Sequence, residues 1–197
     1  FMNTKKIILA SNSPRRKEIL KSLNINFEII PSNYDEPINE NDIFSYQKIE
    51  NIALNKAKSI LNQIKTLSLI ISADTVVVND NKVLLKPKNQ QNAFNILKSL
   101  SNKKHKVVTS VCLYETENNN YITYSSTTKV YFNELSDKQI NNYILTFKPY
   151  DKAGAYGIQE LPDGFLNKIE GSFSNVVGLS KEDLAVNLTK LNINIPN

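Results

Sequence analysis

The stretch LIISADTVVV, residues 69–78, decides the fold that this sequence predicts. It is almost continuously apolar, which is typical of a strand buried on both faces of a sheet. Asp74 interrupts the run, and a carboxylate there is costly unless it is paired, bound to a metal or placed at the mouth of the strand. A structural role in capping a turn is the alternative. We therefore predict a central strand that carries one functional carboxylate.

The segments around this strand alternate between strand and helix patterns. Further strands are expected at Ile7–Ala10, Phe27–Ile30, Val83–Leu85, Lys106–Glu115 and Tyr121–Phe132. Helices are expected at Pro14–Leu23, Phe44–Ile64, Gln90–Leu100, Asp137–Phe147 and after Ser180. This alternation predicts an α/β fold with a mixed sheet flanked by helices. No repeat or linker divides the chain, so we expect one domain over residues 1–197.

The first predicted strand runs into the polar sequence SNSPRR, residues 11–16. Pro14 fits the first turn of a helix, and the N–H groups of a helix N-terminus favour an anion. Serine hydroxyls and two arginines add charge-assisted donors. This pattern favours a phosphate site, although a helix start with two surface arginines is the simpler alternative.

Three further charged residues point to the same chemistry. Lys56 falls inside the apolar stripe of the predicted helix 44–64, so it must extend to solvent, pair with a carboxylate or meet an anion. Lys86 follows the hairpin after the central strand, and Glu36 lies in an acidic loop. Two carboxylates with several cations suit Mg²⁺-assisted attack on a phosphate chain.

Composition argues against several other classes of protein. The net charge is +5, but the lysines are scattered and tryptophan is absent, so we expect no nucleic-acid binding. No apolar run approaches the ~20 residues of a membrane span, and we recognise no signal peptide. A single cysteine, Cys112, excludes an internal disulfide and favours the cytoplasm. The single histidine, His105, is expected to be a strand-end residue and not a catalyst.

Seven motifs, taken in order, resemble those of the Maf family of nucleotide pyrophosphatases, which are related to the inosine triphosphate pyrophosphatases. They are LASNSPRRKEIL, IALNKAKSI, SADTVVV, LLKPKN, HKVVTSVCLY, YDKAGAYGIQ and IEGSFSNVVGLS. The resemblance covers essentially the whole chain. It implies a mixed twisted sheet flanked by helices, with two lobes around a central cleft.

The resemblance also implies a reaction and a set of site residues. Family members cleave nucleoside triphosphates to the monophosphate and pyrophosphate with a divalent cation, Mg²⁺ or Mn²⁺, and a homodimer is expected. By position, Asp74 would accept the proton of the attacking water, with Lys86 and Glu36 beside it, and Glu36 and Asp74 would hold the metal. The phosphate-binding positions fall on Ser11, Ser13, Arg15, Arg16, Lys56 and Lys86. Arg15, Thr75 and Gln159 match positions that determine specificity in the branch acting on dTTP and UTP.

Three residues depart from the pattern of that branch. They are Leu85, where the branch tends to carry a glutamate, Glu160, where a glycine is common, and Ser180, where a proline is common. Leu85 and Glu160 leave the preferred base open, so one alternative is the same reaction on 7-methylguanosine, inosine-type or modified bases. The resemblance implies a second alternative, a nucleotide-binding regulator of cell division or septum formation.

Overall fold

A computed structural model describes residues 5–193, and within them seven strands form one mixed sheet. The strands are β1 (Lys6–Leu9), β2 (Glu28–Ile29), β3 (Ser68–Asn79), β4 (Lys82–Leu84), β5 (Lys104–Glu115), β6 (Asn120–Phe132) and β7 (Leu166–Glu170). Their order is β2-β1-β3-β5-β6-β7, and β4 also pairs with β3. Strands β2, β1 and β3 are parallel, whereas the β3–β5–β6–β7 ladder and the β3–β4 pair are antiparallel.

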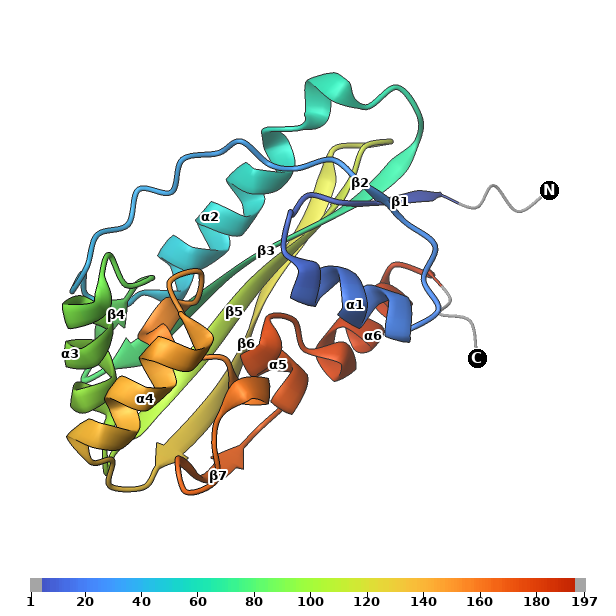
Figure 1. Ribbon diagram of the computed structural model, residues 1–197. Coiled ribbons are helices and arrows are strands. Elements are labelled where there is room, and N and C mark those ends of the chain that lie inside the picture. The colour runs from blue at the N-terminus through green and yellow to red at the C-terminus, as the bar shows by residue number, and fades with distance from the viewer. Residues whose placement is uncertain (1–4, 194–197) are drawn as a thin grey trace.

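Helices cover both faces of this twisted sheet (Figure 1). They are α1 (Pro14–Ser22), α2 (Tyr46–Lys58), α3 (Gln90–Leu100), α4 (Asp137–Phe147), α5 (Phe173–Val177) and α6 (Lys181–Lys190). Helix α2 packs on one face, α1, α5 and α6 lie on the other, and α3 and α4 close the end of the sheet beside β4. The predicted α/β class is confirmed.

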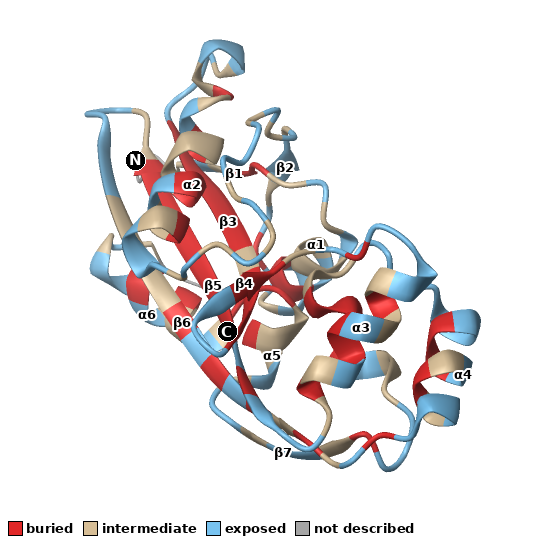
Figure 2. Cartoon of the chain, turned by 90° about the vertical axis from the view of Figure 1, so that its left-hand side faces the viewer, coloured by how far each residue is buried: buried red, intermediate tan, exposed pale blue. Residues whose placement is uncertain are grey.

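The core is built around β3 and β5, whose residues are buried along most of their length (Figure 2). Alternate side chains of β3 enter different clusters. Ile71 and Ala73 pack with Leu20 of α1 and Leu184 of α6, whereas Val76 packs with residues of α2. A third cluster joins the far end of β3 to α3 and α4. The core is therefore divided into several clusters, and β3 contributes side chains to each of these three.

Two predicted elements are shorter in the structure. The helix expected over 44–64 begins at Tyr46 after its N-cap Ser45 and ends at Lys58, and a 3-10 helix, η1 (Leu61–Gln63), follows. The Ser59 hydroxyl donates to the Lys56 carbonyl at 2.8 Å, which satisfies an orphan carbonyl of the last turn. The strand expected over 27–30 pairs with β1 only at Glu28–Ile29.

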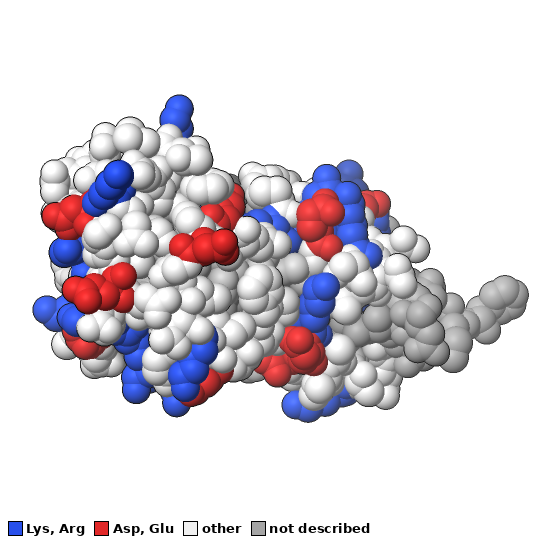
Figure 3. Space-filling model, turned by 60° about the horizontal axis from the view of Figure 1, so that its bottom comes forward, with Lys and Arg blue, Asp and Glu red and all other residues white. Residues whose placement is uncertain are grey.

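One face of the molecule is mixed in charge. On the face drawn in Figure 3, lysine, arginine, aspartate and glutamate side chains are interspersed and form no continuous basic band. Over residues 5–193, none of the helices has both the length and the apolar character needed to cross a membrane.

Candidate active site

The candidate site lies at a gap in the sheet. On one edge of β3, Ser68–Ile71 pair with β1 and Val77–Asn79 pair with β4, so within the described chain residues 72–76 have no partner strand on that edge. Strand β1 ends at Leu9, and the chain turns away after Ala10 donates its N–H to the Ile71 carbonyl at 2.8 Å. The gap exposes the ADT segment of β3 to the groups that surround it.

A cavity of about 680 Å³ opens at this gap, and a second one of about 400 Å³ adjoins it. Nine of the ten predicted site residues line the larger cavity: Ser13, Arg15, Arg16, Glu36, Lys56, Asp74, Thr75, Lys86 and Gln159. Ser11 lines only the smaller cavity, which shares Ser13, Arg15, Arg16, Glu36, Lys56 and Lys86 with the larger one. The structure therefore brings all ten predicted positions to one cleft.

Lys56 joins the two predicted carboxylates. Its ammonium lies 2.7 Å from Asp74 Oδ1 and also forms an ion pair with Glu36. The Lys56 side chain is only 13% exposed and that of Asp74 7%, whereas that of Glu36 is 38% exposed. Of the three roles open to Lys56, the structure shows carboxylate pairing.

Burial raises the pKa of Asp74 above its ordinary value, and the nearby Glu36 carboxylate raises it further, although Lys56 opposes both. Burial also acts to raise the pKa of Glu36, but the Lys56 charge and hydrogen bond outweigh it and leave that pKa below its ordinary value. Within residues 5–193, Asp74 Oδ2 is buried and has no hydrogen-bond partner. Asp74 therefore combines increased basicity with a free acceptor atom, the properties of a general base.

The start of α1 holds Arg16 at the cleft. Ser13 caps the helix by accepting the Arg16 N–H at 3.4 Å. The Arg16 guanidinium donates to the Gly178 carbonyl at 2.9 Å, to Thr75 Oγ1 at 2.9 Å and to Ser11 Oγ at 3.3 Å. Counting only bonds within residues 5–193, two of its five N–H groups stay free to bind an anion.

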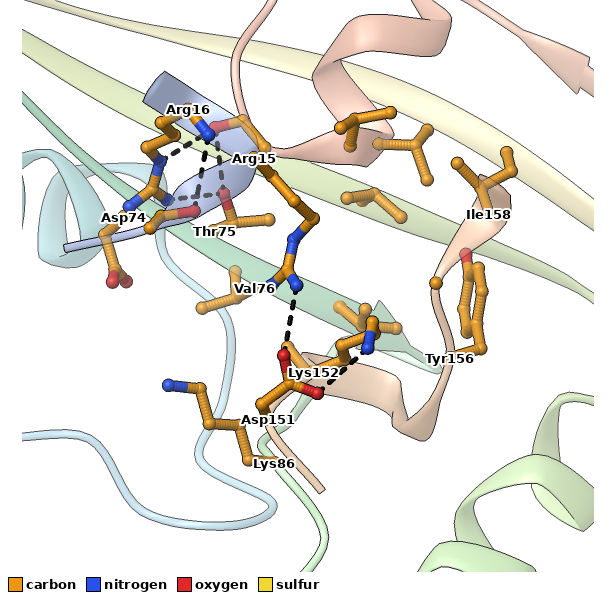
Figure 4. Close-up of a pocket in the computed structure, with 18 of the residues that line it drawn as sticks. Arg15, Arg16, Asp74, Thr75, Val76, Lys86, Asp151, Lys152, Tyr156 and Ile158 are labelled. Carbon is orange, nitrogen blue, oxygen red and sulfur yellow. Dashed lines mark hydrogen bonds and ion pairs between the residues drawn. The ribbon is translucent and has the colours of Figure 1, made fainter. Parts of the chain in front are cut away.

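Arg15 reaches across the cleft to a residue that sequence analysis missed (Figure 4). Its Nη1 lies 3.1 Å from Asp151 Oδ2, on the loop after α4. Asp151 also pairs with Lys152 at 2.9 Å, and Lys152 lies 3.4 Å from Glu160 Oε2. These three residues belong to or adjoin the YDKAGAYGIQ motif, which is the signal that could have identified them.

The segment before Lys86 is held on both sides. The Leu85 N–H donates to the Glu40 carboxylate at 3.0 Å, and the Leu85 carbonyl accepts the Gly154 N–H at 3.2 Å. Gly154 has φ +70°, and a Cβ there would lie 2.7 Å from Val77 Cγ2. Glycine is therefore required at this position, and Glu40 and Gly154 together position Lys86.

One part of the cavity is apolar. Its lining includes Val77, Val107, Val177, Tyr156 and Ile158. The Tyr156 hydroxyl lies 2.7 Å from Nε2 of His105, which is buried within β5 near its start, as expected of a strand-end residue. An apolar part next to a cationic part suits a ligand with an uncharged ring and an anionic tail.

A divalent cation fits the residues present. Among the described residues, histidine, cysteine and carboxylate side chains form no group of three or more that could hold a metal. Glu36 and Asp74 supply two carboxylates, and Asp74 Oδ2 is a buried oxygen to which no atom of the described residues donates a hydrogen bond. One or two carboxylates plus ligand phosphates is the usual way in which proteins hold Mg²⁺.

Comparison with known proteins finds close relatives over nearly the full chain. The family model for Maf-like protein matches residues 6–191. A dTTP/UTP pyrophosphatase of Clostridium perfringens is 44% identical over 192 residues, 96% of this chain and 99% of its own. That of Thermosipho melanesiensis is 51% identical over 173 residues, 88% of this chain and 91% of its own. Among solved structures, a HAM1 protein from Coxiella burnetii, 14% identical, matches 95% of this chain and 100% of its own with a TM-score of 0.48.

Proposed function

Because this chain belongs to the family of Maf-like proteins, we propose that its cleft hydrolyses nucleoside triphosphates to the monophosphate and pyrophosphate. The observation that carries the proposal is the pairing of Lys56 with Asp74 and Glu36 in a cleft that Arg15, Arg16 and Lys86 also line. We infer dTTP and UTP as the preferred substrates, because the relatives at 44% and 51% identity carry that name.

In this proposal, the positive residues bind the phosphate chain. The free N–H groups of Arg16 suit two oxygens of one phosphate, and Ser11 and Ser13 adjoin them at the start of α1. Arg15 exchanges Asp151 for a phosphate oxygen, and Lys86 neutralises the charge of the departing pyrophosphate. Positioning and charge neutralisation are the main contributions of a protein to phosphoryl chemistry.

Asp74 is the proton acceptor in this mechanism. A water beside Oδ2 attacks the α-phosphorus, the bond to the bridging oxygen breaks, and the proton of the water passes to Asp74. Its raised pKa makes the carboxylate a stronger base, and the Lys56 ammonium beside Oδ1 favours its charged form. A divalent cation held by Asp74 and Glu36 would supply charge neutralisation and activation of the water.

A panel of triphosphates with Mg²⁺, assayed for pyrophosphate, tests the proposal. We expect dTTP and UTP to be cleaved fastest, and 7-methylguanosine and inosine triphosphates more slowly. Asp74→Asn should lower kcat by about 10²–10⁴-fold, the usual contribution of a general base, while nucleotide binding stays measurable. Asp35→Asn, in the exposed part of the acidic loop, is the control and should leave kcat unchanged.

Two results would contradict the proposal. Near-normal turnover by Asp74→Asn would remove Asp74 as the base. Binding of nucleotides without release of pyrophosphate would favour the regulator of cell division. The homodimer and the cytoplasmic location stay predictions, which sedimentation and cell fractionation would test.

A further inference from the structure

Thr109 is a buried polar residue to which the mechanism above gives no role. It lies in β5 directly opposite Thr75 of β3, and its side chain is fully buried. It lines neither cavity of the cleft. A buried hydroxyl needs hydrogen-bond partners, and the partners of Thr109 lead to the cleft.

A chain of hydrogen bonds connects Arg16 to Thr109. Arg16 Nη2 lies 2.9 Å from Thr75 Oγ1, which lies 2.9 Å from Thr109 Oγ1. Thr109 Oγ1 in turn lies 3.3 Å from the carbonyl oxygen of Asn175. The Gly178 carbonyl, 3.5 Å from Thr75 Oγ1, is a second acceptor for the Thr75 proton.

The two ends of this series of hydrogen bonds determine which hydroxyl donates and which accepts. A guanidinium only donates, so Thr75 accepts from Arg16, and a carbonyl only accepts. The Thr75 proton therefore points either to Thr109 or, if Thr109 donates to Thr75, to Gly178. In the first arrangement, Thr75 keeps one free lone pair. In neither does Thr75 have a proton left for a ligand in the cleft.

Thr75 lies where the two parts of the cavity meet. Its neighbour Asp74 and its partner Arg16 belong to the charged part, whereas Val77, two residues along β3 and so on the same side as Thr75, belongs to the apolar part. In a nucleotide whose phosphates occupy the charged part, the group at this boundary is the sugar or the near edge of the base.

We propose that Thr109 is a positioning residue that keeps the Thr75 hydroxyl an acceptor toward the cleft, so that the site selects nucleotides presenting an O–H or N–H donor there. This inference rests on the proposed function. Two groups that dTTP and UTP have in common supply such a donor. One is the 3′-hydroxyl of the sugar, and the other is the N3–H of uracil or thymine, which cytosine lacks.

Thr109→Val tests the proposal, because valine keeps the shape of threonine and removes the hydroxyl. Two ratios of kcat/KM distinguish the donors. The ratio for UTP over CTP tests the N3–H of the base, and the ratio for dTTP over its 3′-deoxy analogue tests the 3′-hydroxyl of the sugar. We expect the wild type to show at least a tenfold preference in one pair. Thr109→Val should reduce that preference at least fivefold, because the acceptor then left to the Thr75 proton, the Gly178 carbonyl, lies at the 3.5 Å limit of a hydrogen bond and competes poorly with a ligand in the cleft.

Two controls separate this effect from a general loss of packing. Thr109→Ser restores the hydroxyl and should restore the ratio. Ser68→Ala removes another buried hydroxyl, one that donates to the Thr66 carbonyl at 2.9 Å at the start of β3, and should leave both ratios unchanged. If Thr109→Val does not fold, Thr109→Ala, which adds no bulk, serves the same comparison.

The outcomes separate the two proposals. Failure of the wild type to release pyrophosphate from any triphosphate would overturn the proposed function. Hydrolysis by the wild type with equal rates in both pairs, or with ratios that the Thr109 variants leave unchanged, would overturn the role of Thr109 alone.

Discussion

Replacing Lys56 by methionine would remove the cation that lies between the two carboxylates of the cleft. Removing one partner of a buried ion pair costs about 3–5 kcal/mol, because the other charge stays buried. The Asp74 carboxylate would stay buried without its cation, whereas the Glu36 side chain is 38% exposed and is partly screened by solvent. We therefore expect a loss near the lower end, about 3 kcal/mol. For a chain of this size that lowers the melting temperature by roughly 6–12 °C.

The loss should depend on pH with a definite sign. The pKa of Asp74 is already raised in the folded protein, and removing Lys56 raises it further. A carboxyl whose pKa is higher in the folded than in the unfolded state destabilises the fold above its unfolded pKa, and protonation relieves the effect as pH falls. The difference between variant and wild type should therefore be largest near pH 8 and smaller near pH 5.

Urea unfolding at pH 5 and pH 8 measures the loss of unfolding free energy and its dependence on pH. Lys58→Met, on the same helix but exposed, is the matched control and should change the unfolding free energy by less than about 0.5 kcal/mol. The double variant Lys56→Met/Asp74→Asn should recover at least half of the loss, because residue 74 then carries no charge that needs Lys56 as its partner. Equal stability of Lys56→Met and wild type at pH 8, or a deficit that grows toward pH 5, would refute the reasoning.

Three further changes have defined outcomes. Asp151→Asn releases Arg15 from an exposed pair worth about 0.2–1 kcal/mol, so the KM for dTTP should fall up to about fivefold at low salt and less at high salt. Gly154→Ala forces a Cβ against Val77 at positive φ, and thermal melting should show a loss of about 1–3 kcal/mol. Burial lowers the pKa of His105 to about 4, so the free energy of unfolding should fall by about 3 kcal/mol between pH 6.5 and pH 4. In His105→Gln, urea unfolding should show a smaller dependence of that free energy on pH.

Local signals predicted several elements accurately. The bounds of α3 and α4 agree with the expected ranges, and in α4 the Ser136–Gln139 capping box fixes the start. The buried strand around Asp74 and the hairpin after it were also foreseen, because continuous apolar residues and an Asp-Asn turn are strong signals. Helix α2 was predicted too long because the apolar pattern continues past Lys58 into a 3-10 turn.

The site was predicted as a set of residues but not as an arrangement. Apolar patterning marked Lys56 and Asp74 as unusual, and the family resemblance supplied Glu36 and Gln159. The contact between Arg15 and Asp151 joins residues 136 positions apart, so no local pattern reports it. The Thr75–Thr109 bond likewise depends on the register of β3 and β5, which apolar periodicity alone does not fix.

The gap between β1 and β4 also bears on how the protein avoids aggregation. An unpaired strand edge is a template onto which another chain can add a strand. Here residues 72–76 have no partner strand on one edge, but most of them are buried, and Asp74, Arg16 and Lys56 line the cleft through which another chain would have to approach. Charges on an edge repel an incoming strand, so these side chains protect the fold while they serve the cleft. Variants that neutralise them should aggregate sooner than equally unstable variants altered elsewhere.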